Sequence, residues 1–245
     1  MNHSRTRYRL AALGTAVLTA AALTGCTIVN DGLLDIDPGN RVTQTREITD
    51  VSAVVLATSG SLRLSVGEPS LTISAGEAVL ERLTTTIDGD TLEIGLPGRW
   101  SGNVGRIEYD LVLPALDTVS IRGSGEVTGA LAPADRLTIE ITGSGDVRVD
   151  PVDVSDVAVT IAGSGSVTLE GATSTLAVSI PGSGTFAGAD LEAATAVVSI
   201  SGSGEAEVNV AETLDASIAG SGDITYLGDP RVTSNITGSG DVGEA

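Results

Sequence analysis

The residues best suited to bind an ion follow a tripeptide, Gly-Ser-Gly, that recurs along the second half of the chain. The position directly after each tripeptide is acidic in five of the seven copies, at Glu126, Asp146, Glu205, Asp223 and Asp241. If the copies stack, these carboxylates form one column, and Ca²⁺ prefers oxygen ligands from several carboxylates. Acids are also typical of corners whose side chains turn outward into water. Two interpretations therefore remain, a calcium or ligand column and a solvated corner, and we favour the corner.

Most catalytic chemistry is excluded by the residue types that the chain lacks. Its only histidine is His3, in a segment expected to be removed, its only cysteine is Cys26, and it has no lysine. These limits rule out a Ser-His-Asp triad, a thiol protease, a lysine Schiff base and a His/Cys zinc site. Carboxylate pairs, as in glycosidases, remain available, but no spacing singles out a pair. We therefore expect a protein that is not an enzyme and has no cofactor other than calcium, with a glycan-active enzyme as the least favoured function.

The N-terminal segment 1–25 has the order of a secretory signal peptide. Arg5, Arg7 and Arg9 precede an apolar stretch at 10–22 that is too short for a comfortable membrane span. We expect this segment to be cleaved and the remaining chain to lie outside the cytoplasm.

The tetrapeptide Leu-Thr-Gly-Cys at 23–26 resembles the lipobox of bacterial lipoproteins. The resemblance implies cleavage before Cys26, a diacylglycerol on its sulfur, and attachment to the cell membrane through two or three acyl chains, which hold a soluble domain firmly. The alternative is an ordinary signal peptide followed by an unmodified cysteine. Residues 26–41, which contain turn residues, are then a lipidated tether.

The chain is strongly acidic, with 32 acidic and 13 basic residues and a net charge of −19. Loss of residues 1–25 removes three arginines and no acid, so the remaining chain is more negative still. Such a surface repels nucleic acid and anionic headgroups. We expect no nucleic-acid partner, and membrane affinity that comes from lipid on Cys26.

The tripeptide returns at nearly constant intervals, and the residues around it repeat as well. The copies begin at Gly123, Gly143, Gly163, Gly182, Gly202, Gly220 and Gly238. Two residues before each copy stands an isoleucine, at Ile121, Ile141, Ile161, Ile180, Ile200, Ile218 and Ile236. Two residues after each copy stand Val127, Val147, Val167, Phe186, Ala206, Ile224 and Val242. Apolar and polar residues alternate between the copies, which is typical of half-buried strands.

Two architectures fit this repeat. In an antiparallel meander Gly-Ser-Gly is a hairpin turn, but equivalent strands then do not touch. In a β-helix each repeat is one coil, and equivalent residues stack about 4.8 Å apart. The uniform isoleucine column favours the second, so we predict an all-β fold, a single-stranded β-helix-like solenoid with coils of about 20 residues.

The solenoid domain is expected to span residues 42–245, with regular repeats from about 116. Residues 42–115 form an irregular β segment, in which 75–83 is the best helix candidate. The narrow interior of so short a coil explains why aromatic residues are scarce. Phe186 is expected to lie beside Ala206 in one column, so that a small residue compensates for a large one.

Several segments resemble the bacterial family called putative auto-transporter adhesin, head GIN domain. They are the repeated IxGSGDV-type stretches, LVLPALDTVSIRGSGEV at 111–127, TREITDVSAVVLATSGSLRLSVGE at 45–68 and TTTIDGDTLEIGL at 84–96. The resemblance covers about residues 42–245. It implies an all-β, solenoid-like domain of a secreted or lipid-anchored envelope protein with a surface-binding role, and it brings no catalytic residues.

We therefore expect a lipid-anchored binding or structural module of the cell envelope, with an envelope glycan or a protein as its partner. The alternative is an envelope-sensing or regulatory accessory lipoprotein that works through a membrane-protein partner. Trp100 is either an exposed contact for a sugar or partner, or a cover over an open end of the core. Since the sequence stops shortly after Val242, either residues 42–115 fold back over the array or its C-terminal end contacts another molecule, by self-association for example.

Overall fold

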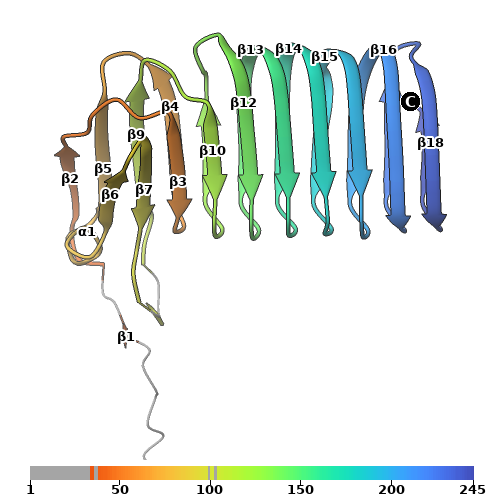
Figure 1. The fold of residues 1–245 in the computed structure, drawn as a ribbon. Helices are drawn as coiled ribbons and strands as arrows, with labels where there is room; N and C mark the ends of the chain where they lie inside the picture. Colours follow the sequence, from red (N-terminus) through yellow and green to blue (C-terminus); the bar gives the residue numbers. More distant parts are fainter. Residues whose placement is uncertain (1–33, 36–37, 99, 102–103) are drawn as a thin grey trace, which may run out of the picture. The chain divides into compact units, whose positions relative to one another are not determined.

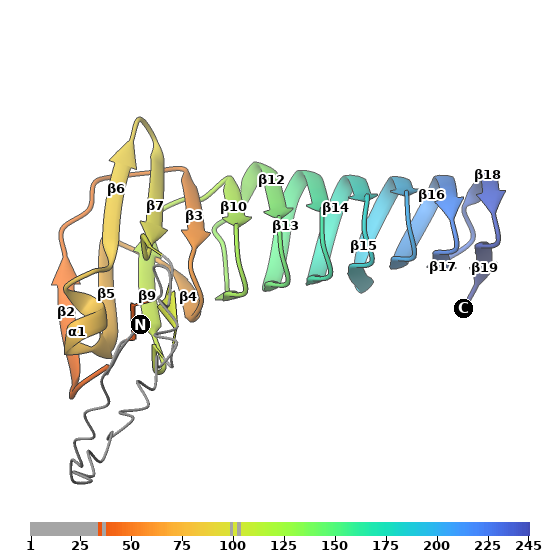
Figure 2. The same cartoon turned by 90° about the horizontal axis from the view of Figure 1, so that it is seen from below.

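The computed structural model describes residues 34–35, 38–98, 100–101 and 104–245. Within these ranges the chain is β-structured except for one short helix, and it winds into a solenoid whose coils follow one another along a line (Figures 1 and 2). Successive regular coils pair in parallel, as when Thr138 aligns with Ala158 of the following coil. The predicted solenoid, with its irregular β segment at the start, is confirmed, and the meander is excluded.

The irregular segment holds the elements β1 (Leu34–Asp35), β2 (Arg41–Arg46), β3 (Ala53–Ala57), β4 (Ser61–Val66), β5 (Ser70–Gly76), α1 (Glu77–Leu80), β6 (Thr84–Asp88), β7 (Thr91–Gly95), β8 (Trp100–Ser101) and β9 (Glu108–Leu113). The regular coils hold β10 (Thr118–Ile121), β11 (Glu126–Gly129), β12 (Ala134–Ile141), β13 (Asp146–Ile161), β14 (Ser166–Ile180), β15 (Thr185–Ile200), β16 (Glu205–Gly220), β17 (Asp223–Leu227), β18 (Arg231–Gly238) and β19 (Asp241–Glu244). The helix lies inside the predicted candidate at 75–83.

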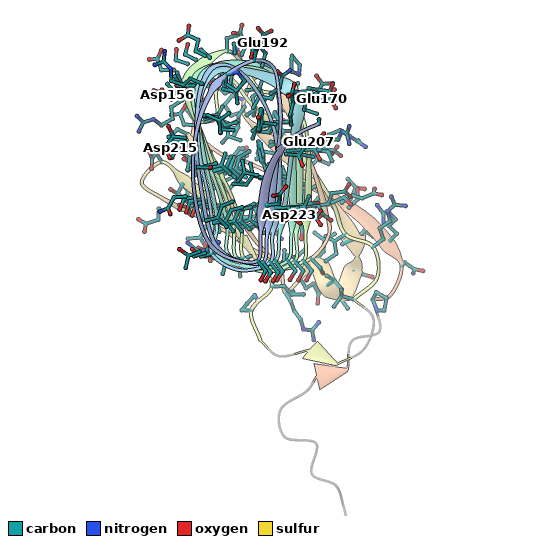
Figure 3. All side chains as sticks on the ribbon, turned by 90° about the vertical axis from the view of Figure 1, so that its right-hand side faces the viewer. Asp156, Glu170, Glu192, Glu207, Asp215 and Asp223 are labelled. Atoms are coloured by element: carbon teal, nitrogen blue, oxygen red, sulfur yellow. The ribbon has the colours of Figure 1, made fainter. Side chains whose placement is uncertain are left out.

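Two layers of strands enclose the core, and the Gly-Ser-Gly corners join them (Figure 3). The pre-corner face consists of β6, β7, β3, β10, β12, the second halves of β13 to β16, and β18. The post-corner face consists of β2, β5, β9, β4, β11, the first halves of β13 to β16, β17 and β19.

The isoleucines before the corners form one column inside the pre-corner face. The register aligns Ile121 with Ile141, Ile141 with Ile161, and Ile180 with Ile200. From Ile121 to Ile218 each is at most 1% exposed. Identical β-branched side chains therefore stack on one another through the coils, as the repeat predicted.

Both glycines of each corner are required by close contacts between neighbouring coils. A Cβ on the first glycine of a corner would lie 2.0–2.4 Å from the carbonyl oxygen of the matching glycine one coil earlier, for every corner from Gly143 to Gly238. A Cβ on the second glycine would lie 2.3–2.9 Å from Cγ2 of the isoleucine one coil earlier, as between Gly184 and Ile161. The isoleucine column therefore fills the space that the glycines leave empty.

Two aromatic rings fit inside the solenoid because small residues lie against them. Phe186 aligns with Ala206, as predicted, and a Cβ on Gly188 would lie 2.5 Å from the Phe186 ring. Tyr109 occupies the equivalent inner position of β9, and a Cβ on Gly60 would lie 2.9 Å from its ring. Burial raises the pKa of the Tyr109 phenol above its ordinary value. The narrow interior thus accepts a ring where a small residue, glycine or alanine, lies against it.

The first coils are not stacked in sequence order. β7 and β9 form the outermost coil, β3 and β4 form the next, and β10 and β11 follow on their other side. β5 and β6 add antiparallel to β9 and β7, and β2 adds antiparallel to β5. Residues 41–113 therefore build one end of the solenoid, and they do not fold back over the C-terminal end.

That N-terminal end is closed by α1 and by one arginine. The side chains of Val79 and Leu80 on α1, and of Leu83 after it, are buried against the core. Arg46 of β2 donates to the carbonyl oxygens of Leu80 and Leu83 at 3.2 and 2.9 Å and to Thr85 Oγ1 at 3.1 Å. It therefore ties the edge strand β2 to the start of β6. Partial burial lowers the pKa of the Arg46 guanidinium.

The contact between isoleucine and glycine can be tested with a double-mutant cycle. Gly184→Ala is expected to destabilise the fold by roughly 1–3 kcal/mol, because its Cβ collides with Ile161 Cγ2. In an Ile161→Ala background the contact with Cγ2 is gone and the contact with the Gly165 carbonyl oxygen at 2.8 Å remains, so the two changes together should cost less than their sum. Denaturant unfolding of the four proteins measures this coupling. Ser183→Ala, at a corner position, is the control and should be near neutral. Strict additivity would contradict the interpretation.

Candidate functional site

The acids after the corners lie in one column on the post-corner face. Glu126 aligns with Asp146, Glu205 with Asp223, and Asp223 with Asp241. Ser166 and Thr185 occupy the two positions between Asp146 and Glu205. The predicted stacking of these residues is confirmed, whereas calcium binding by them stays a prediction.

The column also continues past the repeat, through Ser61 and Glu108, which the sequence did not reveal. Ser61 aligns with Glu126 on one side and with Glu108 on the other. No Gly-Ser-Gly precedes either residue. The only signal is Thr58-Ser59-Gly60 before Ser61, a corner of similar composition.

Several of these side chains hydrogen-bond to the next coil. Asp146 Oδ1 accepts a bond from the backbone N–H of Ser166 at 3.2 Å and another from its hydroxyl. Asp223 Oδ1 accepts a bond from the backbone N–H of Asp241 at 3.0 Å, and the Ser61 hydroxyl donates to Glu126 Oε2 at 3.2 Å. These bonds support the interpretation of the column as a structural corner, because they use carboxylate oxygens to join neighbouring coils.

A shallow hollow of about 380 Å³ lies at the most acidic part of the column. Glu205, Glu207 and Asp223 line it together with small residues such as Thr225, and Figure 3 shows Glu207 and Asp223 on the same side of the solenoid. Among the residues that the structure describes, no group of three or more His, Cys, Asp or Glu has an arrangement that could hold a metal ion. Glu207 was not predicted, since it stands two positions beyond the acidic column.

The two faces differ in the charge of their outward side chains. On the pre-corner face from β13 to β16 there are three outward columns: Asp156, Thr175, Thr195 and Thr213; Ala158, Ala177, Val197 and Asp215; and Thr160, Ser179, Ser199 and Ser217. Asp156 and Asp215 are the only acids in these three columns, and Val197 is 57% exposed. Figure 3 places Glu170 and Glu207 on the opposite side from Asp156 and Asp215, with Glu192 at the bend between the faces. The pre-corner face is therefore a flat surface rich in hydroxyl groups and alanine.

A wider groove of about 1020 Å³ lies at the N-terminal end, between β2, α1 and the start of β6. Its polar lining includes Arg46, Glu47, Glu77 and Glu81. Because Arg46 is bonded to backbone carbonyls of the same end, the groove belongs to the structure that closes the N-terminal end.

Two predicted residues are not tested by this geometry. Cys26 lies outside the described residues, so its lipidation stays a prediction. Trp100 begins β8, whose backbone pairs in parallel with Leu34 of β1, and its role as a contact also stays a prediction. Among the described residues, none of the helical structure has the length and hydropathy of a membrane-spanning helix.

Comparison with known proteins identifies both a family and a shared fold. A family model described as "Putative auto-transporter adhesin, head GIN domain" matches residues 51–230. No curated protein sequence matches the chain. A crystal structure of a putative adhesin from Bacteroides fragilis has a TM-score of 0.82 at 23% identity, covering 86% of this chain and 100% of that one.

Two further solved structures are similar. A putative lipid binding protein from Parabacteroides distasonis has a TM-score of 0.70 at 23% identity, over 86% of this chain and 99% of the other. A putative adhesin from Parabacteroides merdae has a TM-score of 0.68 at 18% identity, over 87% and 99%. At these identities the three structures show the solenoid fold.

The charge of the acidic column yields a stability prediction. Asp223 is flanked by Glu205 and Asp241 on the neighbouring coils, and like charges on adjacent strands repel. Asp223→Asn keeps the Oδ1 acceptor for Asp241 and removes the charge. We expect the melting temperature to rise at low salt, by an amount that shrinks as salt is added.

Calcium separates the two interpretations of the column in the same thermal assay. If the column is a solvated corner, calcium should change the melting temperatures of the wild type and of Asp223→Asn by the same amount. A melting temperature that calcium raises only in the wild type would make the column a cation site, since a ligand of the native state alone must stabilise it. Asp190→Asn, an acid away from the column, is the matched control.

Proposed function

The chain belongs to the putative auto-transporter adhesin, head GIN domain family, and from this we propose that it is a non-catalytic, lipid-anchored binding module on the outer side of a bacterial cell membrane. The adhesin description of the family and of two structural neighbours supports a place at the cell surface. The lipobox-like tetrapeptide that ends at Cys26 supports the anchor.

One observation carries the proposal: the solenoid runs in a line between two ends of different construction (Figure 1). The chain enters through β2 at the end that α1 and Arg46 close, and its last strands, β18 and β19, form the other end. A chain fixed at its N-terminus therefore carries a stack of coils whose far end is presented to the surroundings. This is a suitable construction for contact at a distance from an anchor.

The non-catalytic part of the proposal is supported by the side chains and by the shape of the surface. After residue 26 the chain contains neither histidine nor lysine nor cysteine, which removes the usual nucleophiles and bases apart from carboxylates and hydroxyls. Two hollows that contain several carboxylates, at the N-terminal end and beside Asp223, are open to solvent. Catalytic sites are usually concave and largely exclude water.

Replacement of the anchor residue tests the membrane attachment. In a bacterial host that processes lipoproteins, the wild type is expected in the membrane fraction with a lipid-modified Cys26, as mass spectrometry of its N-terminal peptide would show. Cys26→Ala should lose the lipid and appear in the soluble extracytoplasmic fraction, because no basic patch replaces the acyl chains. Thr27→Ala should behave like the wild type. A wild type whose Cys26 carries no lipid would contradict the proposal.

Ligand binding is measured separately, with Cys26→Ala protein coupled to beads through its N-terminus. Saturable binding of purified envelope glycans or of lipid vesicles would identify the class of ligand. Specific recovery of one membrane protein from detergent extracts would favour a regulatory lipoprotein instead. Turnover of a glycan would show an enzyme and overturn the non-catalytic assignment.

A further inference from the structure

The two ends of the solenoid differ in how their last strands are covered. At the N-terminal end α1 lies over the core, with Val79 and Leu80 buried. At the opposite end β18 pairs only with β16, and β19 only with β17, within the part of the chain that the structure describes. Solenoids need a cap at each end, because a bare terminal coil exposes strand edges and core residues.

The C-terminal coil does expose part of the core. Ile236, the last member of the isoleucine column, is 40% exposed, whereas Ile218 one coil earlier is 1% exposed. Val232 and Val242, the last members of two further inner columns, are only partly buried. This terminal surface, formed by β18 and β19, is called the tip below.

The free edge of β18 presents a regular set of backbone groups. In earlier coils the N–H of Thr138 bonds to the carbonyl oxygen of Asp117, and that of Thr142 to the carbonyl oxygen of Ile121. Residues in the outward columns therefore point their backbone groups to the preceding coil, and residues in the inward columns point theirs to the following one. In β18 the inward columns hold Val232, Ser234 and Ile236, so their N–H and C=O groups face the free edge.

This edge lacks the charges that usually protect an edge strand. From Val232 to Gly240 there is no charged residue, in a chain with a net charge of −19. Edge strands of natural proteins are commonly protected by charged side chains or by proline. Two copies of this acidic chain repel each other least if they meet through a surface that carries no charge. The only charged residue of β18 is Arg231 at its start, and Asp241 follows the corner after its other end.

We propose that the tip binds a second copy of this chain, through antiparallel pairing of the two β18 edges about a twofold axis at Ser234. This register places Val232 opposite Ile236 of the second copy, with their backbone groups facing each other. It also places Arg231 opposite Thr237 of the second copy, twice by symmetry. The contact is isologous and so closes as a dimer.

The proposal rests on the surface-binding function proposed above and names its partner. The first strands of the solenoid lie at the end opposite the tip, so a tip-to-tip dimer of chains anchored at their N-termini would join copies held on two facing surfaces. Head-to-tail stacking is disfavoured because α1 and Arg46 already cover the N-terminal end.

Sedimentation equilibrium of the Cys26→Ala chain over a wide range of concentrations tests the dimer. A monomer–dimer equilibrium is expected, and Ser234→Asp should weaken it by about tenfold or more, because it places two carboxylates together on the axis. Ser203→Asp, at a corner of an earlier coil, is the matched control and should leave the dimer unchanged. Monomers at every concentration, open-ended polymers, or a dimer indifferent to Ser234→Asp would each overturn the proposal.

Charge placement tests the register without touching the core. Thr237→Arg should weaken the dimer, because Thr237 lies opposite Arg231 of the second copy, and Thr237→Arg combined with Arg231→Glu should restore it, because opposite charges then face each other. Failure of the double variant to recover would exclude this register.

Bead clumping separates the failure of this inference from failure of the proposed function. Beads coated through the N-terminus of the chain should clump, and beads that carry Ser234→Asp should not. Beads that bind an envelope ligand without clumping would overturn tip pairing and leave the binding function standing. A wild type without lipid on Cys26 would overturn the anchored function, whatever the tips do.

Discussion

The structure depends on one contact, repeated at every regular corner, between an isoleucine methyl group and a glycine one coil later. Cγ2 of Ile161 occupies the place where a Cβ on Gly184 would be, and the same holds from Ile121 to Ile218. The contact fixes the distance between coils and their register together, because neither a larger residue at the glycine nor a shift along the strand is tolerated. Interior packing of this kind is as close as in organic crystals and resists small changes of volume.

The arrangement of charge follows from that fixed register. Once the corners are aligned, residues directly after them must form a column, whatever their charge, and the acids among them consequently lie above one another on a single face. Hydrogen bonds from the next coil to Asp146 and Asp223 offset part of the repulsion. The pre-corner face is governed by the same register but holds alanine, serine and threonine, so one molecule presents an acidic face and a nearly neutral one.

The regular coils could be predicted from the sequence because each of their contacts repeats. Ile121 to Ile236, the residues after the corners, and the pairing of Phe186 with Ala206 are all readable at a fixed spacing. The order of the first coils could not be predicted. β3 pairs with β7 on one side and with β10 on the other, and both of these strands come later in the sequence. Ser61 and Glu108 joined the acidic column only through that order. The hydrogen bonds of Arg46 that close the N-terminal end could not be predicted either. Its partners Leu83 and Thr85 lie in a distant segment of the chain and belong to no repeat.

The order of the first coils also determines when this protein can fold. Ala53 of β3 must wait for Thr91 of β7 and Thr118 of β10, whereas Thr138 in a regular coil needs only the coil that follows it. β2 has no partner until β5 has been made, and β3 and β4 have none until β7 and β9 have been made, because non-local pairing requires closure of a long loop. The first coils are therefore completed only when the strands from β7 to β11 are available. The regular coils, by contrast, can be added one after another in chain order onto β10 and β11.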